Sequence, residues 1–271
     1  MALARAKINL ALHVLGRRDD GYHELDSIVA FANVGDVVSL EPAAGNVIEV
    51  TGPFARFVPR DESNLALRAL ALASDLGKVP RPMKVTLEKN LPVASGMGGG
   101  SADAAAVLKL AFPDADPVKL AAAALRLGAD IPACLHGAMC RMRGVGEQIA
   151  PLPAAKPLHA VLANPGVAAS TADVFKSLGL KPGQRFGDPI ASEDDPHSWR
   201  NDLSDAAIAV APEIADVLDE LSNVREAGTV RMSGSGATCF ALFETSAAAE
   251  TAAERIANRQ PQWWVRAAML Q

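Results

Sequence analysis

An α+β fold is predicted for this chain of 271 residues, and two observations predict it. Strand-like and helix-like segments are mixed along the chain, and the strand-like segments cluster early. A doubly wound α/β sheet would instead alternate strands and helices regularly. Hydrophobic residues make up 49% of the chain, which is enough for a packed core, and aromatic residues only 4%, so that Ala, Leu and Val are expected to fill that core.

The first element is the clearest strand. In residues 6–14, apolar side chains alternate with mostly polar ones, which places Lys7 and Asn9 on one face of the strand. The segment GRRDDG at residues 16–21 is a turn. Further strands are expected at 23–31, 36–40, 47–51 and 83–87. Helices are expected at 65–76, with Ser63 or Asn64 as the N-cap, at 101–112, with Ser101 as the N-cap, and at 116–128.

A proline-rich stretch at residues 151–157 is the best candidate for a domain boundary, and it predicts domains at 1–153 and 154–271. The long segment 181–200, which is rich in Pro, Gly and acidic residues, is expected to be a loop. The second half is expected to contain strands at 158–163, 229–232, 238–243 and 264–267, and helices at 171–178, 202–210, 213–221 and 247–257.

Composition narrows the classes of partner. The net charge of −5 disfavours general nucleic-acid binding, which needs a basic face. No apolar run approaches the roughly 20 residues of a membrane span, so no membrane partner is expected. The three cysteines lack CxxC spacing, which disfavours a disulfide framework or a zinc site. A cytoplasmic protein, a monomer or at most a weak homodimer, is the expectation.

The most informative segment is the glycine-rich stretch at residues 92–103, PVASGMGGGSAD, which leads directly into a predicted helix. Glycine lets the backbone approach a polyphosphate closely, and a helix N-terminus carries partial positive charge, so the segment predicts an anion site. It lacks the third glycine of a dinucleotide fingerprint and the lysine of a P-loop. A flexible turn that only connects strand to helix is the alternative.

Four segments resemble the GHMP kinase superfamily, and they occur in that family's order. PVASGMGGGSADAA resembles its nucleotide loop, LGADIPACL the segment with its catalytic aspartate, and RMSGSGATCFALF its third motif. The N-terminal segment ARAKINLALHVLGRRDDGYHELDS resembles the branch of the superfamily that acts on a cytidyl diphosphate. Together the segments span residues 4–243, so the resemblance covers nearly the whole chain.

The resemblance implies both a fold and an activity. The fold would pair a ribosomal-S5-like N-terminal domain with a ferredoxin-like C-terminal domain. The activity would be ATP-dependent phosphorylation of the 2-hydroxyl of 4-diphosphocytidyl-2-C-methyl-D-erythritol, in the non-mevalonate isoprenoid precursor pathway. ATP would act as a co-substrate with Mg²⁺, and no tightly bound prosthetic group is expected.

The resemblance also assigns candidate roles to individual residues. Lys7 and Asp130 would be catalytic, the aspartate facing the hydroxyl and the lysine keeping it ionised. Ser101 is a weak candidate ligand for Mg²⁺. Residues expected to bind ATP are Asn64, Leu65, Lys89, Pro92, Val93, Ala94, Ser95, Gly96, Met97, Gly98, Gly99, Gly100, Ser101 and Ala102. Residues expected to bind the acceptor are Asn9, Tyr22, His23, Thr171, Phe175, Gly234 and Ser235, with the three aromatic rings at the cytosine.

Each assignment has an ordinary structural alternative. Asp130 could simply end a turn, Asn64 could cap a helix, and Lys89 could be an exposed lysine at a strand end. Two other activities compete with the implied one: a kinase of the same superfamily acting on homoserine or a mevalonate-type acid, and a nucleotide-binding module without turnover. The segment GYHELDS and Phe175 favour a cytidyl acceptor, while Lys7, Asn9 and Asp130 together disfavour a module without turnover.

Overall fold

The computed structural model describes residues 1–76, 82–153 and 156–271, and it confirms the α+β class. The chain forms two compact units that are interleaved in sequence. Unit 1 comprises Met1–Lys7, Val34–Val93 and Gly98–Gly137, and unit 2 comprises Ile8–Asn33, Ala94–Met97 and Ala138–Gln271. The domains expected at 1–153 and 154–271 stay a prediction, and residues 154–155 at their boundary lie outside the described residues.

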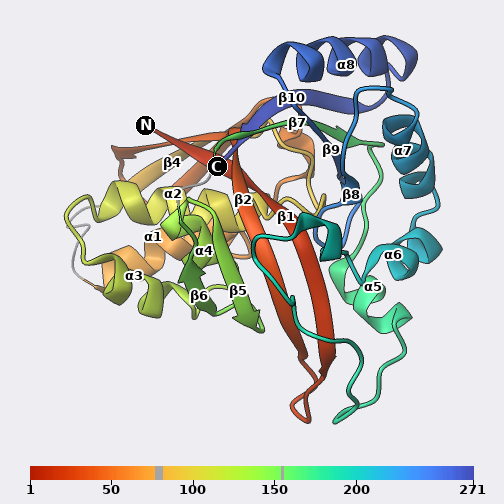
Figure 1. Ribbon diagram of the computed structural model, residues 1–271. Helices are drawn as coiled ribbons and strands as arrows, with labels where there is room; N and C mark the ends of the chain where they lie inside the picture. The colour runs from red at the N-terminus through yellow and green to blue at the C-terminus, as the bar shows by residue number, and fades with distance from the viewer. Residues whose placement is uncertain (77–81, 154–155) are drawn as a thin grey trace. The chain divides into compact units, whose positions relative to one another are not determined.

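Unit 1 combines a small sheet with helices (Figure 1). Strand β4 (Met83–Glu88) pairs antiparallel with the end of β2 (His23–Pro42) and parallel with β3 (Val47–Thr51). Helix α1 packs against α2, and α4 packs against both α2 and α3. The helical segments are η1 (Ala55–Phe57), α1 (Leu65–Asp75), α2 (Gly99–Ala111), α3 (Pro117–Ala124) and α4 (Ile131–His136). Fully buried aliphatic side chains such as Leu70, Leu87 and Leu108 fill the core, as the scarcity of aromatic residues predicts.

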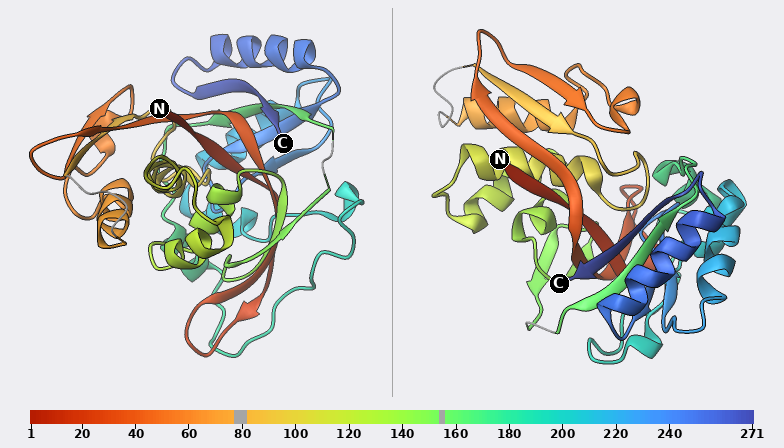
Figure 2. Two further views of the ribbon diagram at one scale, coloured as in Figure 1. Left: turned by 90° about the vertical axis from the view of Figure 1, so that its left-hand side faces the viewer. Right: turned by 90° about the horizontal axis from the view of Figure 1, so that it is seen from above.

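Unit 2 contains an antiparallel sheet with the strand order β10–β7–β9–β8. Its strands are β7 (Leu158–Asn164), β8 (Val230–Met232), β9 (Cys239–Phe243) and β10 (Trp264–Leu270). Its helical segments are α5 (Thr171–Ser177), η2 (Pro196–Ser198), α6 (Ser204–Val210), α7 (Glu213–Ser222) and α8 (Ser246–Arg259). Figure 2 shows α8 lying across β7 and β10, against which it packs. This order of strands and helices is typical of a ferredoxin-like fold.

Unit 2 also holds most of β1 (Ala2–Arg17) and the first part of β2, which pair with each other. Strand β5 (Cys140–Gly144) pairs with this part of β2 on one side and with β6 (Gln148–Pro151) on the other. The loop 181–200 runs beside β1: the Gly187 N–H donates to the Val14 carbonyl at 3.0 Å, and the Leu12 N–H donates to the Arg200 carbonyl at 2.8 Å. The loop is thus held in place by main-chain hydrogen bonds.

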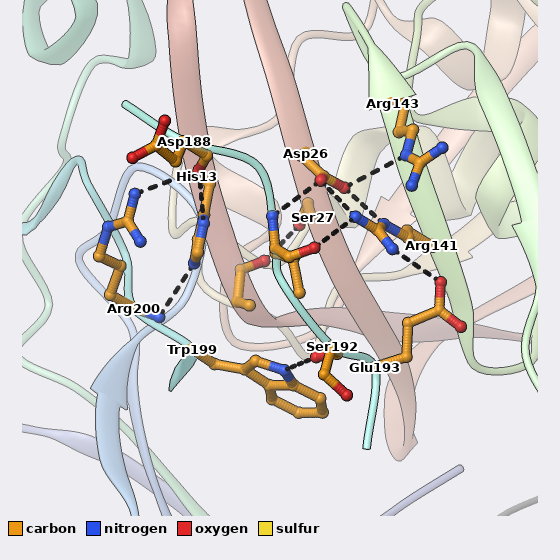
Figure 3. Close-up of polar contacts among 12 residues, drawn as sticks. His13, Asp26, Ser27, Arg141, Arg143, Asp188, Ser192, Glu193, Trp199 and Arg200 are labelled. Atoms are coloured by element: carbon orange, nitrogen blue, oxygen red, sulfur yellow. Dashed lines mark hydrogen bonds and ion pairs between the residues drawn. The ribbon is translucent and has the colours of Figure 1, made fainter. Parts of the chain in front are cut away.

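A buried ion pair anchors the middle of the same loop (Figure 3). Arg141 donates to both carboxylate oxygens of Asp26, at 2.7 and 2.6 Å, and also to the Ile190 carbonyl and Glu193. Burial alone raises the pKa of Asp26, but hydrogen bonds from Arg141 and Ile190 together with the guanidinium charge bring it below its ordinary value. Asp26 therefore stays ionised and keeps its hydrogen bonds with Arg141 and with the Ile190 N–H of the loop.

The structure differs from the expected elements at several points. Strand β2 runs without a break through the two segments expected at 23–31 and 36–40. Helix α2 begins at Gly99 with Gly98 as its N-cap, so Ser101 is not the cap, and the helix expected at 116–128 ends at Ala124. Helix α4 and strands β5 and β6 were not expected. Among the described residues, no helix is long and apolar enough to cross a membrane.

Candidate active site

Unit 1 brings the two expected catalytic residues together. The Lys7 Nζ lies 2.8 Å from the Asp130 Oδ1. The lysine side chain is only 6% exposed, whereas the aspartate side chain is 37% exposed. Asp130 occupies the N-cap position of α4, yet within the described part of the chain its carboxylate makes no capping hydrogen bond. The helix therefore does not use this carboxylate, which leaves its exposed face available for chemistry.

Helix α2 begins beside this ion pair. Gly98 has a left-handed backbone with φ 62°, and a Cβ on it would lie 3.4 Å from the Lys7 Cε and 3.8 Å from the Asp130 Oδ2. The first N–H groups of a helix have no partner within it and carry partial positive charge. An anion bound at the start of α2 would therefore lie next to the lysine and its carboxylate.

The earlier part of the glycine loop belongs to unit 2, where it contacts the loop after β8. The Thr238 N–H donates to the Ser95 carbonyl at 3.0 Å, and the Ser233 hydroxyl donates to the Gly96 carbonyl at 3.0 Å. Gly96 has φ 75°, and a Cβ there would collide with the carbonyl oxygen of Ser233. Glycine is required at this position both for its backbone conformation and for this close approach.

The loop after β8 also carries two of the expected acceptor-binding residues, Gly234 and Ser235. The hydroxyls of Thr171 and Ser235 lie 2.8 Å apart and share a hydrogen bond. The side-chain amide of Asn201 donates to the carbonyls of Met232 and Gly234, both at 2.8 Å. The sequence analysis did not single out Asn201, because its two partners are more than thirty residues away and no motif marks it.

The rings of His23 and Phe175 stack, with centroids 4.5 Å apart and an interplanar angle of 28°. Burial lowers the pKa of His23, and the charge of Arg17 lowers it further, so the imidazole is neutral at pH 7. Its Nε2 is buried and has no hydrogen-bond partner among the described residues. Tyr22, by contrast, is 65% exposed. A ring inserted between His23 and Phe175 would require these two side chains to move apart.

Two polar residues that the sequence assigns to ATP binding, Asn64 and Lys89, instead make hydrogen bonds within unit 1. Asn64 caps α1: its Oδ1 accepts the Ala66 N–H at 2.8 Å, and its Nδ2 donates to the Pro59 carbonyl at 2.7 Å. Lys89 is 3% exposed and donates to Asp36 at 2.5 Å and to Asp103 at 2.7 Å. These contacts favour structural roles for both side chains.

The Lys89 cluster places one buried cation between two buried carboxylates. The Asp36 Oδ1 also accepts the N–H groups of Asn90 and Leu91, at 2.6 and 2.8 Å. Burial raises the pKa of Asp103 to about 7, with the charge of Lys89 opposing the shift and that of Asp36 adding to it. Burial lowers the pKa of Lys89, but the charges of Asp103 and Asp36 outweigh it and raise the value overall. The cluster is a cross-link of the fold beneath the first turn of α2.

Two family models match the chain. Residues 64–138 match the GHMP kinases N terminal domain, and residues 191–262 match the GHMP kinases C terminal domain. The chain is 50% identical over 276 residues to the 4-diphosphocytidyl-2-C-methyl-D-erythritol kinase of Paracoccus denitrificans strain Pd 1222, covering 98% of this chain and 95% of that protein.

Solved structures agree with these sequence matches. A crystal structure of 4-(cytidine 5'-diphospho)-2C-methyl-D-erythritol kinase superposes with a TM-score of 0.82 at 34% identity, covering 99% of this chain and 98% of that one. A homoserine kinase from Cytophaga hutchinsonii superposes with a TM-score of 0.67 at 19% identity, covering 97% of this chain and 92% of that one. The second likeness concerns the fold alone.

Proposed function

The chain belongs to the GHMP kinase family, and on that premise we propose that it transfers the γ-phosphoryl group of ATP to the 2-hydroxyl of 4-diphosphocytidyl-2-C-methyl-D-erythritol. The observation that carries the proposal is the 50% identity, over nearly the full length, to a kinase of that name. The lysine–aspartate pair beside the N-terminus of α2 supports it with the groups that such a transfer needs. This reaction belongs to the non-mevalonate route to isoprenoid precursors.

The roles in unit 1 follow from charge. The N–H groups at the start of α2 would hold phosphate oxygens, because they are partial positive charges without helical partners. The Asp130 carboxylate would orient the acceptor hydroxyl and receive its proton. The Lys7 ammonium would keep that carboxylate ionised and stabilise negative charge on the transferring group.

The roles in unit 2 concern the acceptor. His23 and Phe175 would bind the cytosine ring, the neutral imidazole offering a nitrogen to its polar edge and the phenyl ring a stacking surface. Tyr22 would add a second ring from its exposed position. Asn9, Thr171, Gly234 and Ser235 would contact the rest of the acceptor.

Mg²⁺ would enter with ATP as part of the co-substrate. Among the described residues, no group of three or more His, Cys, Asp or Glu side chains could hold a metal ion by itself. A metal ion carried by the nucleotide needs few protein ligands, and Ser101, in the first turn of α2, offers one hydroxyl. A cytoplasmic location, where ATP is abundant, belongs to the same proposal.

The test separates the acceptors. The purified protein is incubated with MgATP and, in separate reactions, with 4-diphosphocytidyl-2-C-methyl-D-erythritol, homoserine or mevalonate, and ADP formation is followed. We expect acceptor-dependent ADP only with the cytidyl compound. ADP formation with homoserine or mevalonate alone would assign the chain to another branch of the family, and no ADP with any acceptor would indicate a nucleotide-binding module.

A further inference from the structure

Asn9 is held by two serine hydroxyls in unit 2. Its main-chain N–H donates to the Ser233 Oγ at 3.0 Å, and its side-chain Nδ2 donates to the Ser27 Oγ at 2.8 Å. Asn9 is 4% exposed and Ser27 is 3% exposed, so water does not compete for these contacts. Ser27 follows Asp26 on β2, where Figure 3 shows both side chains.

The hydrogen bond that the Ser27 hydroxyl donates fixes the orientation of the Asn9 side-chain amide. The Ser27 hydroxyl donates to the Ala11 carbonyl at 2.5 Å, and a carbonyl oxygen can only accept. With its single proton committed, the Ser27 Oγ offers only lone pairs to Asn9. The group of Asn9 that faces it must therefore be the NH₂, because the carbonyl oxygen would meet those lone pairs without a proton between them.

The fixed amide leaves its carbonyl oxygen unused. The Asn9 Oδ1 is buried and has no hydrogen-bond partner among the described residues. Buried polar atoms are rarely left this way, and each exception calls for an explanation. An oxygen in this state can take only a hydrogen-bond donor, and the acceptor molecule of the proposed reaction has hydroxyl groups on its polyol part.

We propose that Ser27 is a positioning residue that holds the Asn9 carbonyl oxygen ready to accept a hydrogen bond from a hydroxyl of the polyol. The inference rests on the proposed function, because it takes Asn9 as part of the acceptor site. Asn9 thus accepts a hydrogen bond from the hydroxyl. The hydrogen bonds from Asn9 to Ser27 and from Ser27 to the Ala11 carbonyl fix the amide in the orientation that this requires.

The test uses Ser27→Ala, which removes the hydroxyl at little cost in volume, and Ser27→Thr, which retains it. Without the hydroxyl, the Asn9 amide loses its fixed orientation, and we expect kcat/KM for the cytidyl acceptor to fall about tenfold, the worth of one hydrogen bond. The KM for ATP should stay within about twofold, since that change removes no group from the nucleotide loop. Ser27→Thr should retain most of the wild-type kcat/KM.

Inhibition by CDP separates positioning from a general structural role, because CDP contains the base, ribose and diphosphate of the acceptor but lacks its methylerythritol. Its inhibition constant should be the same for Ser27→Ala and the wild type. Ser222→Ala is the matched control: this serine of unit 2 also donates to a main-chain carbonyl, that of Leu218 at 2.7 Å, and its loss should change neither constant. Thermal unfolding checks that each variant is folded.

Three results would overturn the inference: wild-type kinetics in Ser27→Ala, equal weakening of the acceptor and CDP, or an equal loss in a folded Ser27→Thr. Failure of the proposed function is a separate result, since the wild type itself would then form no ADP with the cytidyl acceptor.

Discussion

In the described part of unit 1, Lys89 and Lys7 each contact aspartate at a similar distance, but their surroundings differ. Lys89 meets Asp36 and Asp103, and all three side chains are at most 5% exposed. Among the described residues, Lys7 forms an ion pair with Asp130 alone, at 2.8 Å, and that carboxylate is 37% exposed. The first contact is enclosed within the fold, while the second opens one carboxylate face to solvent beside the N-terminus of α2. Exposure and spare hydrogen-bonding capacity, rather than the charges themselves, distinguish the pair that we propose to be catalytic from the structural cluster.

The largest effect on activity is expected at the open pair, which is Lys7 with the solvent-exposed carboxylate of Asp130. Lys7→Met removes the ammonium but keeps a long apolar side chain in a buried position, and kcat should fall about 100- to 1,000-fold, as on removing one group that stabilises transition-state charge. Steady-state kinetics with the cytidyl acceptor measure it. Lys84→Met is the control, because Lys84 pairs with Glu41 and Glu49 in the same unit. A similar rate for Lys7→Met and the wild type would remove Lys7 from the reaction.

The closed cluster, which is Lys89 with Asp36 and Asp103, should instead lower the stability of the fold when one of its carboxylates is replaced. Among the described residues, three donors meet the Asp36 carboxylate: the Lys89 ammonium and the N–H groups of Asn90 and Leu91. In Asp36→Asn, the new side-chain amide would turn its own NH₂ toward one of these donors, so the free energy of unfolding should fall by about 3–5 kcal/mol. Urea unfolding measures the loss. Wild-type stability in this variant would contradict the cross-linking role of the cluster.

Asp103 should give a smaller, pH-dependent effect. Because its pKa in the folded protein is raised to about 7, the folded state binds more protons than the unfolded state between about pH 4 and 7. The contribution of this carboxyl to stability is therefore present at low pH and is lost as pH rises through 7. Relative to Asp103→Asn, the wild type should lose stability from pH 5 to pH 8 and change little above that. Parallel urea midpoints for the two proteins across this range would show that Asp103 titrates normally.

The smallest effect concerns Asn64, whose side chain the fold also uses fully. Asn64→Ala removes the N-cap of α1 and should cost about 1 kcal/mol of stability. The KM for ATP should stay unchanged, because both ends of the amide are occupied by Ala66 and Pro59. An increase in that KM of tenfold or more, in a folded variant, would instead place Asn64 at the nucleotide.

Local patterns predicted much of this fold, and distant contacts explain what they missed. The cap at Asn64 depends on a neighbour two residues away, so the sequence alone could indicate it. The role of Lys89 depends on Asp36, 53 residues away, and no local pattern reveals it. Gly35 lies within β2 where a Cβ would collide with the Ala4 carbonyl, and this contact with a residue 31 positions away has no local pattern to reveal it.

The same distinction between local patterns and distant contacts applies to the candidate site. Family motifs indicated both Lys7 and Asp130, although 123 residues separate them, and the structure brings them into contact. The start of α2 was placed at Ser101 because serine is a common N-cap, whereas the helix begins at Gly99, after a left-handed N-cap at Gly98. Ser27 and Asn201 act through partners remote in sequence, and only the folded chain reveals them.

The central claim, that the open pair performs chemistry and the closed cluster stabilises the fold, is tested most directly by the kcat of Asp130→Asn and Asp36→Asn measured side by side. Both enzymes are saturated with MgATP and the cytidyl acceptor, at a temperature where each is folded, and the rates are divided by the folded fraction from circular dichroism. The account predicts a loss of about 100- to 10,000-fold for Asp130→Asn and a rate within about threefold of wild type for Asp36→Asn. A near-wild-type rate for Asp130→Asn, or an equal loss in both variants, would contradict it.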